Sequence, residues 1–132
     1  MTLDVLDINV LVRFLVGDNT AQKKQAEQWF KEGESGKRKI VVLPIVVAEG
    51  SFVLESFYKK RREEIANAFE IFLSQRWLQV AERDTLLSLW KWYREGLHFV
   101  DSFLLAWARL NAGRVLTFDK ELLVINNHHE RK

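Results

Sequence analysis

Four acidic residues stand in places where an acid needs an explanation. Asp7 and Asp119 each directly follow a short apolar run of the kind that forms a β-strand. Asp101 lies near the start of a long apolar stretch, and Glu49 interrupts another. Acids are rarely buried in proteins unless they are paired or bind a cation. The two acids at strand ends and the two in apolar stretches are therefore candidates for a functional site.

Each of the four has a plain structural alternative. Asp7, like Asn9 two residues later, is of a type that caps helices and forms Asx turns. Asp101 would favour a helix N-terminus through the helix dipole, and Asp119 would cap a final helix. Glu49 would pair with an arginine or extend to solvent. The residues alone leave these alternatives open.

If the four carboxylates meet, their charge must be compensated. Two like charges 4 Å apart repel by roughly 4 kcal/mol at an effective dielectric constant of about 20, so protons or a divalent cation are required. The chain has no Cys, and none of its three His is an obvious ligand, which leaves an all-oxygen donor set. Such a set suits Mg²⁺ or Mn²⁺, and these ions typically serve phosphoryl chemistry. The acids therefore predict a metal-dependent phosphodiesterase.

The composition is that of a single folded domain over residues 1–132. Hydrophobic residues make up 48% of the chain, enough for a substantial core, and no Pro/Gly-rich linker divides the sequence. We see neither an export signal nor an apolar run of membrane-spanning length, so we expect a cytoplasmic protein. The net charge of +2 is too small to argue for nucleic acid by itself.

Short apolar runs alternate with amphipathic stretches along the chain. This alternation predicts an α/β fold, a small three-layer α/β/α sandwich with a central parallel sheet of four to five strands. We expect strands over residues 2–6, 40–43, 77–80 and 114–117, and helices over 9–16, 20–33, 44–58, 65–73, 84–96 and 99–111, with Thr20 and Asp84 as caps. Residues 119–132 would form a short helix, or a final strand around 122–125.

The spacing of the acids and their neighbours resembles that of the PIN-domain ribonucleases. Within that family it is most similar to the VapC toxins of toxin–antitoxin pairs. The resemblance covers nearly the whole chain. It rests on the segment Leu6-Asp7-x-Asn9-Val10-Leu11, on Glu49 after the second strand, on Phe99-x-Asp101-Ser102, and on Thr117-Phe118-Asp119.

The resemblance implies a function. By it, Asp7, Glu49, Asp101 and Asp119 bind Mg²⁺ or Mn²⁺ and cut single-stranded RNA or RNA loops, leaving a 5′-phosphate and a 3′-hydroxyl. Asn9 and Thr117 would support the four acids by hydrogen bonding. The resemblance also implies a homodimer and a VapB-like antitoxin that reaches the acidic site. Ile8 departs from the pattern, since the family usually carries Thr or Ser there.

Basic residues offer weaker indications of RNA contact. The candidates for binding phosphate are Arg13, Lys37, Arg38, Lys39 and the run 59–62. Solvated loop charges explain each of them equally well.

Rival functions fit the acids less well. A haloacid-dehalogenase-like phosphatase needs a second Asp at the position of Asn9, and a receiver domain would leave Glu49 without a role. A metal-independent ribonuclease would need His or Lys as acid and base. The chief rival is a degenerate PIN domain that serves as a protein- or RNA-binding scaffold.

Overall fold

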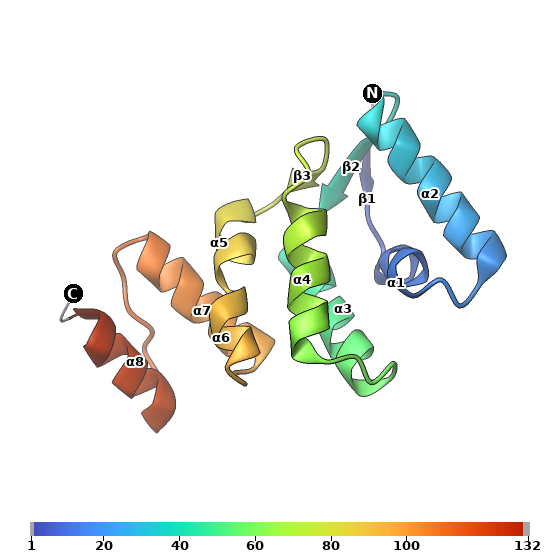
Figure 1. Ribbon diagram of the computed structural model, residues 1–132. Helices are drawn as coiled ribbons and strands as arrows, with labels where there is room; N and C mark the ends of the chain where they lie inside the picture. Colours follow the sequence, from blue (N-terminus) through green and yellow to red (C-terminus); the bar gives the residue numbers. More distant parts are fainter. Residues whose placement is uncertain (1, 131–132) are drawn as a thin grey trace. The chain divides into compact units, whose positions relative to one another are not determined.

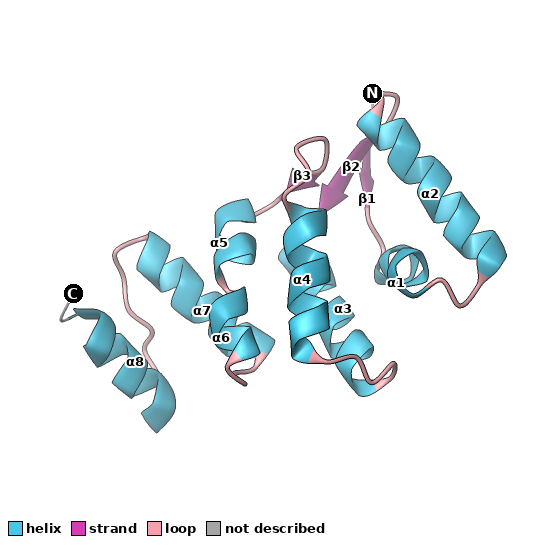
Figure 2. Cartoon of the chain, viewed as in Figure 1, coloured by secondary structure: helices cyan, strands magenta, loops and turns pink. Residues whose placement is uncertain are grey.

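A computed structural model describes residues 2–130, with side chains described up to residue 126. The chain divides into two compact units, residues 1–83 and 84–132, which we call the N-terminal and C-terminal units and describe separately. The elements in chain order are β1 Leu3–Val5, α1 Ile8–Val16, α2 Thr20–Glu34, β2 Lys39–Val42, α3 Pro44–Ser56, α4 Arg62–Leu73, β3 Gln79–Val80, α5 Arg83–Ser88, α6 Trp90–Arg94, α7 Phe99–Leu110 and α8 Lys120–Glu130 (Figures 1 and 2).

The N-terminal unit is built on a small parallel sheet with the strand order β1-β2-β3. Val5 pairs with Val41 of β2, and Val42 pairs with Val80 of β3. Parallel neighbours need a crossover between them. Helices α1 and α2 provide the first crossover, and α3 and α4 the second. The prediction of an α/β fold with a parallel sheet is confirmed.

The carboxyl ends of β1 and β2 position the first two candidate acids. Leu6 still donates its backbone N–H to the carbonyl of Val41 at 2.9 Å, and Asp7 then begins the turn into α1. After β2, Pro44 occupies the first turn of α3, where its missing N–H costs nothing. Since the two strands are parallel, both helices start from the same edge of the sheet, and α1 packs on α3.

Aromatic rings fill the space beside the sheet. The ring of Phe30 lies 4.8 Å from that of Phe14 in an edge-to-face contact, 5.6 Å from that of Phe72 and 5.9 Å from that of Trp77. Edge-to-face and tilted pairs at these separations are favourable beyond the area they bury. Phe69 of α4 is fully buried. These rings hold α1, α2 and α4 together.

Gly33 lets α2 approach Trp77 closely. A Cβ built on Gly33 would lie 2.8 Å from Cζ3 and 2.9 Å from Cε3 of the indole. Gly33→Ala gains about 1 kcal/mol of helix propensity but overpacks against a rigid ring at a cost of about 1–3 kcal/mol. We expect a net loss of stability, measured by urea unfolding. Trp77→Leu should relieve that loss in the double variant. A Gly33→Ala protein more stable than wild type would contradict this account.

The C-terminal unit consists of helices joined by loops over its described residues. Trp90 is fully buried, and its ring meets those of Tyr93 at 5.3 Å and Phe99 at 5.8 Å. These contacts join α6 to α7, and α7 packs on α8. None of the helices within residues 2–130 combines the length and the apolar character needed to cross a membrane.

The predicted fourth strand, residues 114–117, is not found. The sheet that the structure describes has three strands, so the four to five strands predicted are not confirmed. The Asn126 side chain forms hydrogen bonds with both backbone polar groups of Val115. Its Oδ1 accepts from the Val115 N–H at 3.3 Å, and its Nδ2 donates to the Val115 carbonyl at 2.8 Å. A side-chain amide thus takes the two groups that a strand neighbour would use. Leu116 is 96% exposed.

Several element boundaries also differ from prediction. The helix predicted over residues 84–96 is two helices, α5 and α6, and the Ser88 hydroxyl donates to the Asp84 carbonyl just before the break. The cap of α2 is Asn19, whose side chain accepts from the Gln22 N–H, and Thr20 is already helical. β3 is shortened to two residues, because Arg83 donates to the Leu78 carbonyl. Residues 122–125 are helical.

Candidate active site

The Asp7 carboxylate is exposed and unengaged. Asp7 has the extended backbone of a helix N-cap, but its side chain makes no capping hydrogen bond. It forms no ion pair among the described residues. Asp7 therefore has the backbone conformation of a helix cap, but capping gives its carboxylate no role. The Asn9 amide, in the first turn of α1, also makes no hydrogen bond within the described part of the chain.

Glu49 lies on an exposed part of α3. Its side chain reaches solvent, together with those of Ile45 and Phe52, which are four residues before and three after it on the same helical surface. Of the two structural alternatives for Glu49, pairing with an arginine or extending to solvent, the structure shows the second. Next to it, Gly50 faces α1: a Cβ there would lie 2.7 Å from Cδ1 of Ile8. Ile8 thus fills space between α1 and α3 with an apolar side chain.

The other two acids lie in the C-terminal unit. Asp101 is half-buried in the first turn of α7, where the helix dipole favours an acid, and it has no partner among the described residues. Asp119 caps α8, because its Oδ1 accepts from the backbone N–H groups of Glu121 at 2.9 Å and Leu122 at 3.1 Å. Thr117 Oγ1 accepts from the Asp119 N–H at 3.0 Å. The capping alternative for Asp119 is confirmed.

The four acids are divided between the units. Asp7 and Glu49 belong to the N-terminal unit, and Asp101 and Asp119 to the C-terminal unit. Within the described residues of each unit, no three acidic or histidine side chains gather closely enough to hold a metal ion. Neither unit by itself therefore supplies three such ligands from its described side chains.

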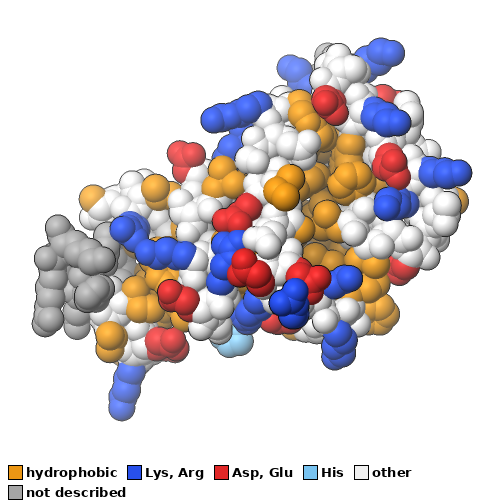
Figure 3. Space-filling view, in the orientation of Figure 1, with side chains coloured by type: hydrophobic (Ala, Val, Ile, Leu, Met, Phe, Trp, Pro, Cys, Tyr) orange, Lys and Arg blue, Asp and Glu red, His pale blue; other side chains and the backbone are white. Residues whose placement is uncertain are grey.

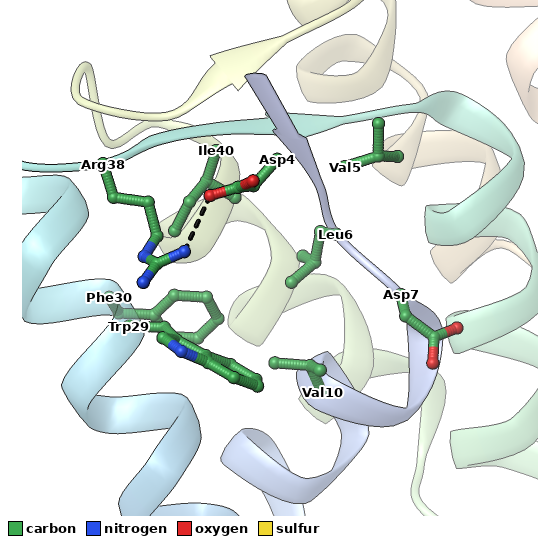
Figure 4. A pocket seen from close by; sticks show the side chains of 9 residues that line it. All are labelled: Asp4, Val5, Leu6, Asp7, Val10, Trp29, Phe30, Arg38 and Ile40. Carbon is green, nitrogen blue, oxygen red and sulfur yellow. Dashed lines mark hydrogen bonds and ion pairs between the residues drawn. The ribbon is translucent and has the colours of Figure 1, made fainter. Parts of the chain in front are cut away.

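Two hollows flank the start of α1, and Asp7, Val10 and Trp29 line both of them. The larger, about 270 Å³, is mostly apolar and runs along β1 to Arg38 and Ile40. Figure 4 shows that Asp4 points to Arg38 across it, whereas the Asp7 carboxylate turns away from its interior. The smaller, about 250 Å³, also has a mostly apolar surface, to which Val10 and Trp29 contribute, and polar side chains of α1 and α2 stand around it.

Arg13 is held in place by a network at the edge of the smaller hollow. It donates to Asp18 at 3.0 Å, to the Tyr58 hydroxyl at 3.0 Å and to Gln22 Oε1 at 2.8 Å. The Tyr58 hydroxyl, with Arg13, lowers the pKa of Asp18, and Asp18 raises the pKa of Arg13 and of Tyr58. Arg13, a candidate for binding phosphate, is therefore fixed in position, and its guanidinium is already paired with the Asp18 carboxylate.

The other basic candidates differ in whether they already form ion pairs. Arg38 forms ion pairs with Asp4 and Glu32, both at 2.7 Å, and Lys37 and Lys39 are exposed. Over the part of the surface that α2 covers, basic and acidic side chains are interspersed (Figure 3). Charge alone does not identify an RNA-binding face, as the small net charge suggested.

The Asp18 network gives a pH-dependent contribution to stability. The folded state holds the pKa of Asp18 below its ordinary value of 3.8, so the contribution is present above that value and is lost as the pH falls through the folded pKa. We expect the gap in urea midpoint between wild type and Asp18→Asn to narrow as the pH falls below 3.8.

The matched control for this pH series is Glu34→Gln. It removes an exposed acid that has no ion pair among the described residues. Its urea midpoint should follow that of wild type over the same pH range. A gap for Asp18→Asn that stays constant down to the lowest pH would contradict the assignment.

The polar wall of the smaller hollow was missed by the sequence analysis. Gln22, Gln25 and Trp29 line it from α2. Their spacing of three and four residues places them on one face of a helix, and this signal was present in the sequence. Trp29 is one of several large aromatic residues, with Phe30, Phe57, Trp90 and Trp92, that from sequence alone either fill the core or leave apolar surface for contacts. Of those, Phe30, Trp90 and Trp92 are buried, and Phe57 is exposed.

Comparison with known protein families identifies the fold. Residues 5–127 match the PIN domain. The chain therefore belongs to the PIN domain family, and the match contains all four acids. PIN domains are generally metal-dependent nucleases, so membership indicates a nuclease-type hydrolase. No curated protein and no solved structure matches the chain significantly.

Proposed function

We propose that the protein is a divalent-metal-dependent endoribonuclease and that Asp7, Glu49, Asp101 and Asp119 form its site. The observation that carries this proposal is that all four acids lie within the PIN match and that none has an ion-pair partner among the described residues. An unpaired carboxylate is available to a cation. By contrast, Asp4 and Glu32 form ion pairs with Arg38, and neither belongs to the four proposed site residues.

The proposed site takes two acids from each unit. Asp7 directly follows β1, and Glu49 lies on α3, which follows β2. Asp101 lies in the first turn of α7, and Asp119 caps α8. Four carboxylates that share one site repel one another, so the site would depend on a bound cation.

The donor set fits a hard cation. Carboxylate oxygens from the four acids, without thiolate or imidazole, suit Mg²⁺ or Mn²⁺. Asp7, Asp101 and Asp119 would hold the ion, with Glu49 holding it through water. The second oxygen of Asp119 remains available while Oδ1 caps α8. When bound, such an ion polarises a phosphodiester and offsets the charge that develops on it. Asn9 and Thr117 would keep the acids in position.

We further propose that the nuclease is the VapC-like toxin of a toxin–antitoxin pair and works in the cytoplasm as a homodimer with a VapB-like antitoxin. Its substrate is RNA. Arg13, Lys37 and Lys39 would contact RNA phosphates, and Arg38 would do so only by giving up an ion pair with Asp4 or Glu32. The sequence resemblance supports this finer assignment.

The experiment is cleavage of a mixed, structured RNA pool by purified protein with Mg²⁺ or Mn²⁺, and with EDTA as the control. We expect discrete cuts that disappear with EDTA. Expression in a host without the antitoxin should arrest growth, and Glu49→Gln should relieve the arrest. Absence of cleavage with every metal, together with harmless expression, would favour the binding-scaffold alternative.

A further inference from the structure

The smaller hollow beside Asp7 has the chemistry of a site for a flat, polar ring. Its lining residues are Asp7, Asn9, Val10, Arg13, Gln22, Gln25 and Trp29. Its volume of about 250 Å³ is below the range of about 300–1,000 Å³ that is typical of sites for drug-sized ligands. A hollow of this size has room for one ring system.

Its wall presents polar groups that the protein does not use. The Gln25 amide and the Trp29 indole N–H make no hydrogen bond with any described residue, and the Asn9 amide is likewise unengaged. Trp29 is half-buried, and Figure 4 shows its indole reaching from α2 to the side of Val10 on α1. An aromatic face with free amides around it is what an unstacked nucleobase needs.

The orientation of one amide is fixed in advance. Arg13 has only donors, so Gln22 must turn its Oε1 to Arg13, and the 2.8 Å bond leaves its Nε2 free to donate. Arg13 is fixed in turn by Asp18 and Tyr58. Ordering these long side chains before a ligand arrives lowers the entropy cost of binding it.

We propose that this hollow binds one unpaired base of the RNA, next to the phosphodiester that is cut. The inference rests on the proposed nuclease function, because Asp7 is both a wall of the hollow and a proposed metal ligand. Trp29 stacks on the base, and the amides of Gln22 and Gln25 bond to its edge. RNA bases are read in this way mostly in single strands and loops.

The test uses the Asp7→Asn protein, which should bind RNA without cutting it, and a short fluorescein-labelled single-stranded RNA of mixed sequence. Fluorescence anisotropy gives the affinity. Trp29→Ala in that background should weaken binding roughly 5- to 150-fold, the range for loss of one stacked base. Gln25→Ala should weaken it by a smaller factor. A duplex of the same sequence should bind all variants alike.

Matched controls come from the same unit. Gln28→Ala removes an α2 amide that bonds to Glu32, and Phe57→Ala removes an exposed aromatic ring. Neither residue lines the hollow, and neither variant should change binding. Gln25 is exposed, so Gln25→Ala decides the matter even if Trp29→Ala fails to fold.

The two proposals fail separately. Unchanged single-strand affinity in both variants, or no single-strand binding by the Asp7→Asn protein, would overturn the base site while leaving metal-dependent cleavage to stand on its own assay. Affinity that falls in the variants, with a wild-type protein that cuts no RNA under any metal, would support the base site and overturn the nuclease.

Discussion

Asp7→Asn should reduce the rate of RNA cleavage by roughly 100-fold or more, since even the loss of an outer partner of a bound metal can cost 10–100-fold. The substitution keeps the size of the side chain and removes its charge. The fold should be unaffected, because the Asp7 side chain makes no capping bond and Asn caps helices as well as Asp. Single-turnover cleavage and thermal unfolding of the same preparation measure both effects.

Asp4→Asn is the matched control for that experiment. Asp4 lies on β1 three residues before Asp7 and is paired with Arg38, and it is not one of the four proposed ligands. The variant should cleave RNA at a rate within a few-fold of wild type. Full activity in Asp7→Asn would remove Asp7 from the site. An equal loss in Asp4→Asn would show that the effect is not specific to the site.

Phe69→Ala should lower the free energy of unfolding by about 3–5 kcal/mol, the usual cost of deleting a large buried aromatic side chain. Phe69 is fully buried in α4, and its ring lies beside Gly50 of α3. Domains are typically stable by only about 5–15 kcal/mol, so the variant should be close to unfolding at ordinary temperature. Urea unfolding followed by circular dichroism measures the loss.

Phe57→Ala is the control for this prediction. Phe57 is 74% exposed at the end of α3, so the variant should unfold within about 0.5 kcal/mol of wild type. Similar losses for the two substitutions would mean that Phe69 does not lie in a close-packed core.

Much of the fold could be predicted from local pattern. The apolar run before Asp7, the Pro44 start of α3 and the left-handed Gly17 after α1 are all decided by residues close in sequence, and each was predicted within one or two positions. The α/β fold class and the parallel direction of the strands follow from the alternation of strands and helices. The family match agrees with them.

The missed features depend on bonds from side chains to the backbone, which local apolar patterns do not encode. The strand expected at 114–117 was inferred from apolar content, but Asn126 takes the backbone bonds of Val115 from eleven residues away. β3 is cut short by Arg83, whose reach to the Leu78 carbonyl no propensity predicts. Side-chain to backbone bonds of this kind compete with strand pairing.

The sequence identified the four candidate acids, but it did not predict the structural surroundings of each one. Residue types and neighbours pointed to Asp7, Glu49, Asp101 and Asp119, and the family match includes all four. Their surroundings were harder to predict. Glu49 was expected to need an explanation as an acid in an apolar helix, yet it is exposed beside Ile45 and Phe52. Sequence shows that a helix is apolar, but not which of its faces the fold leaves open.

Mn²⁺ binding tests the central proposal, that Asp7, Glu49, Asp101 and Asp119 bind a divalent cation. Electron paramagnetic resonance of free Mn²⁺ in a titration reports the affinity without any RNA. Wild type should bind the ion, and Asp7→Asn and Asp101→Asn should each weaken binding by at least roughly 10-fold, with Asp4→Asn unchanged. Wild-type affinity in Asp101→Asn, with loss in Asp7→Asn, would contradict a site that contains both Asp7 and Asp101.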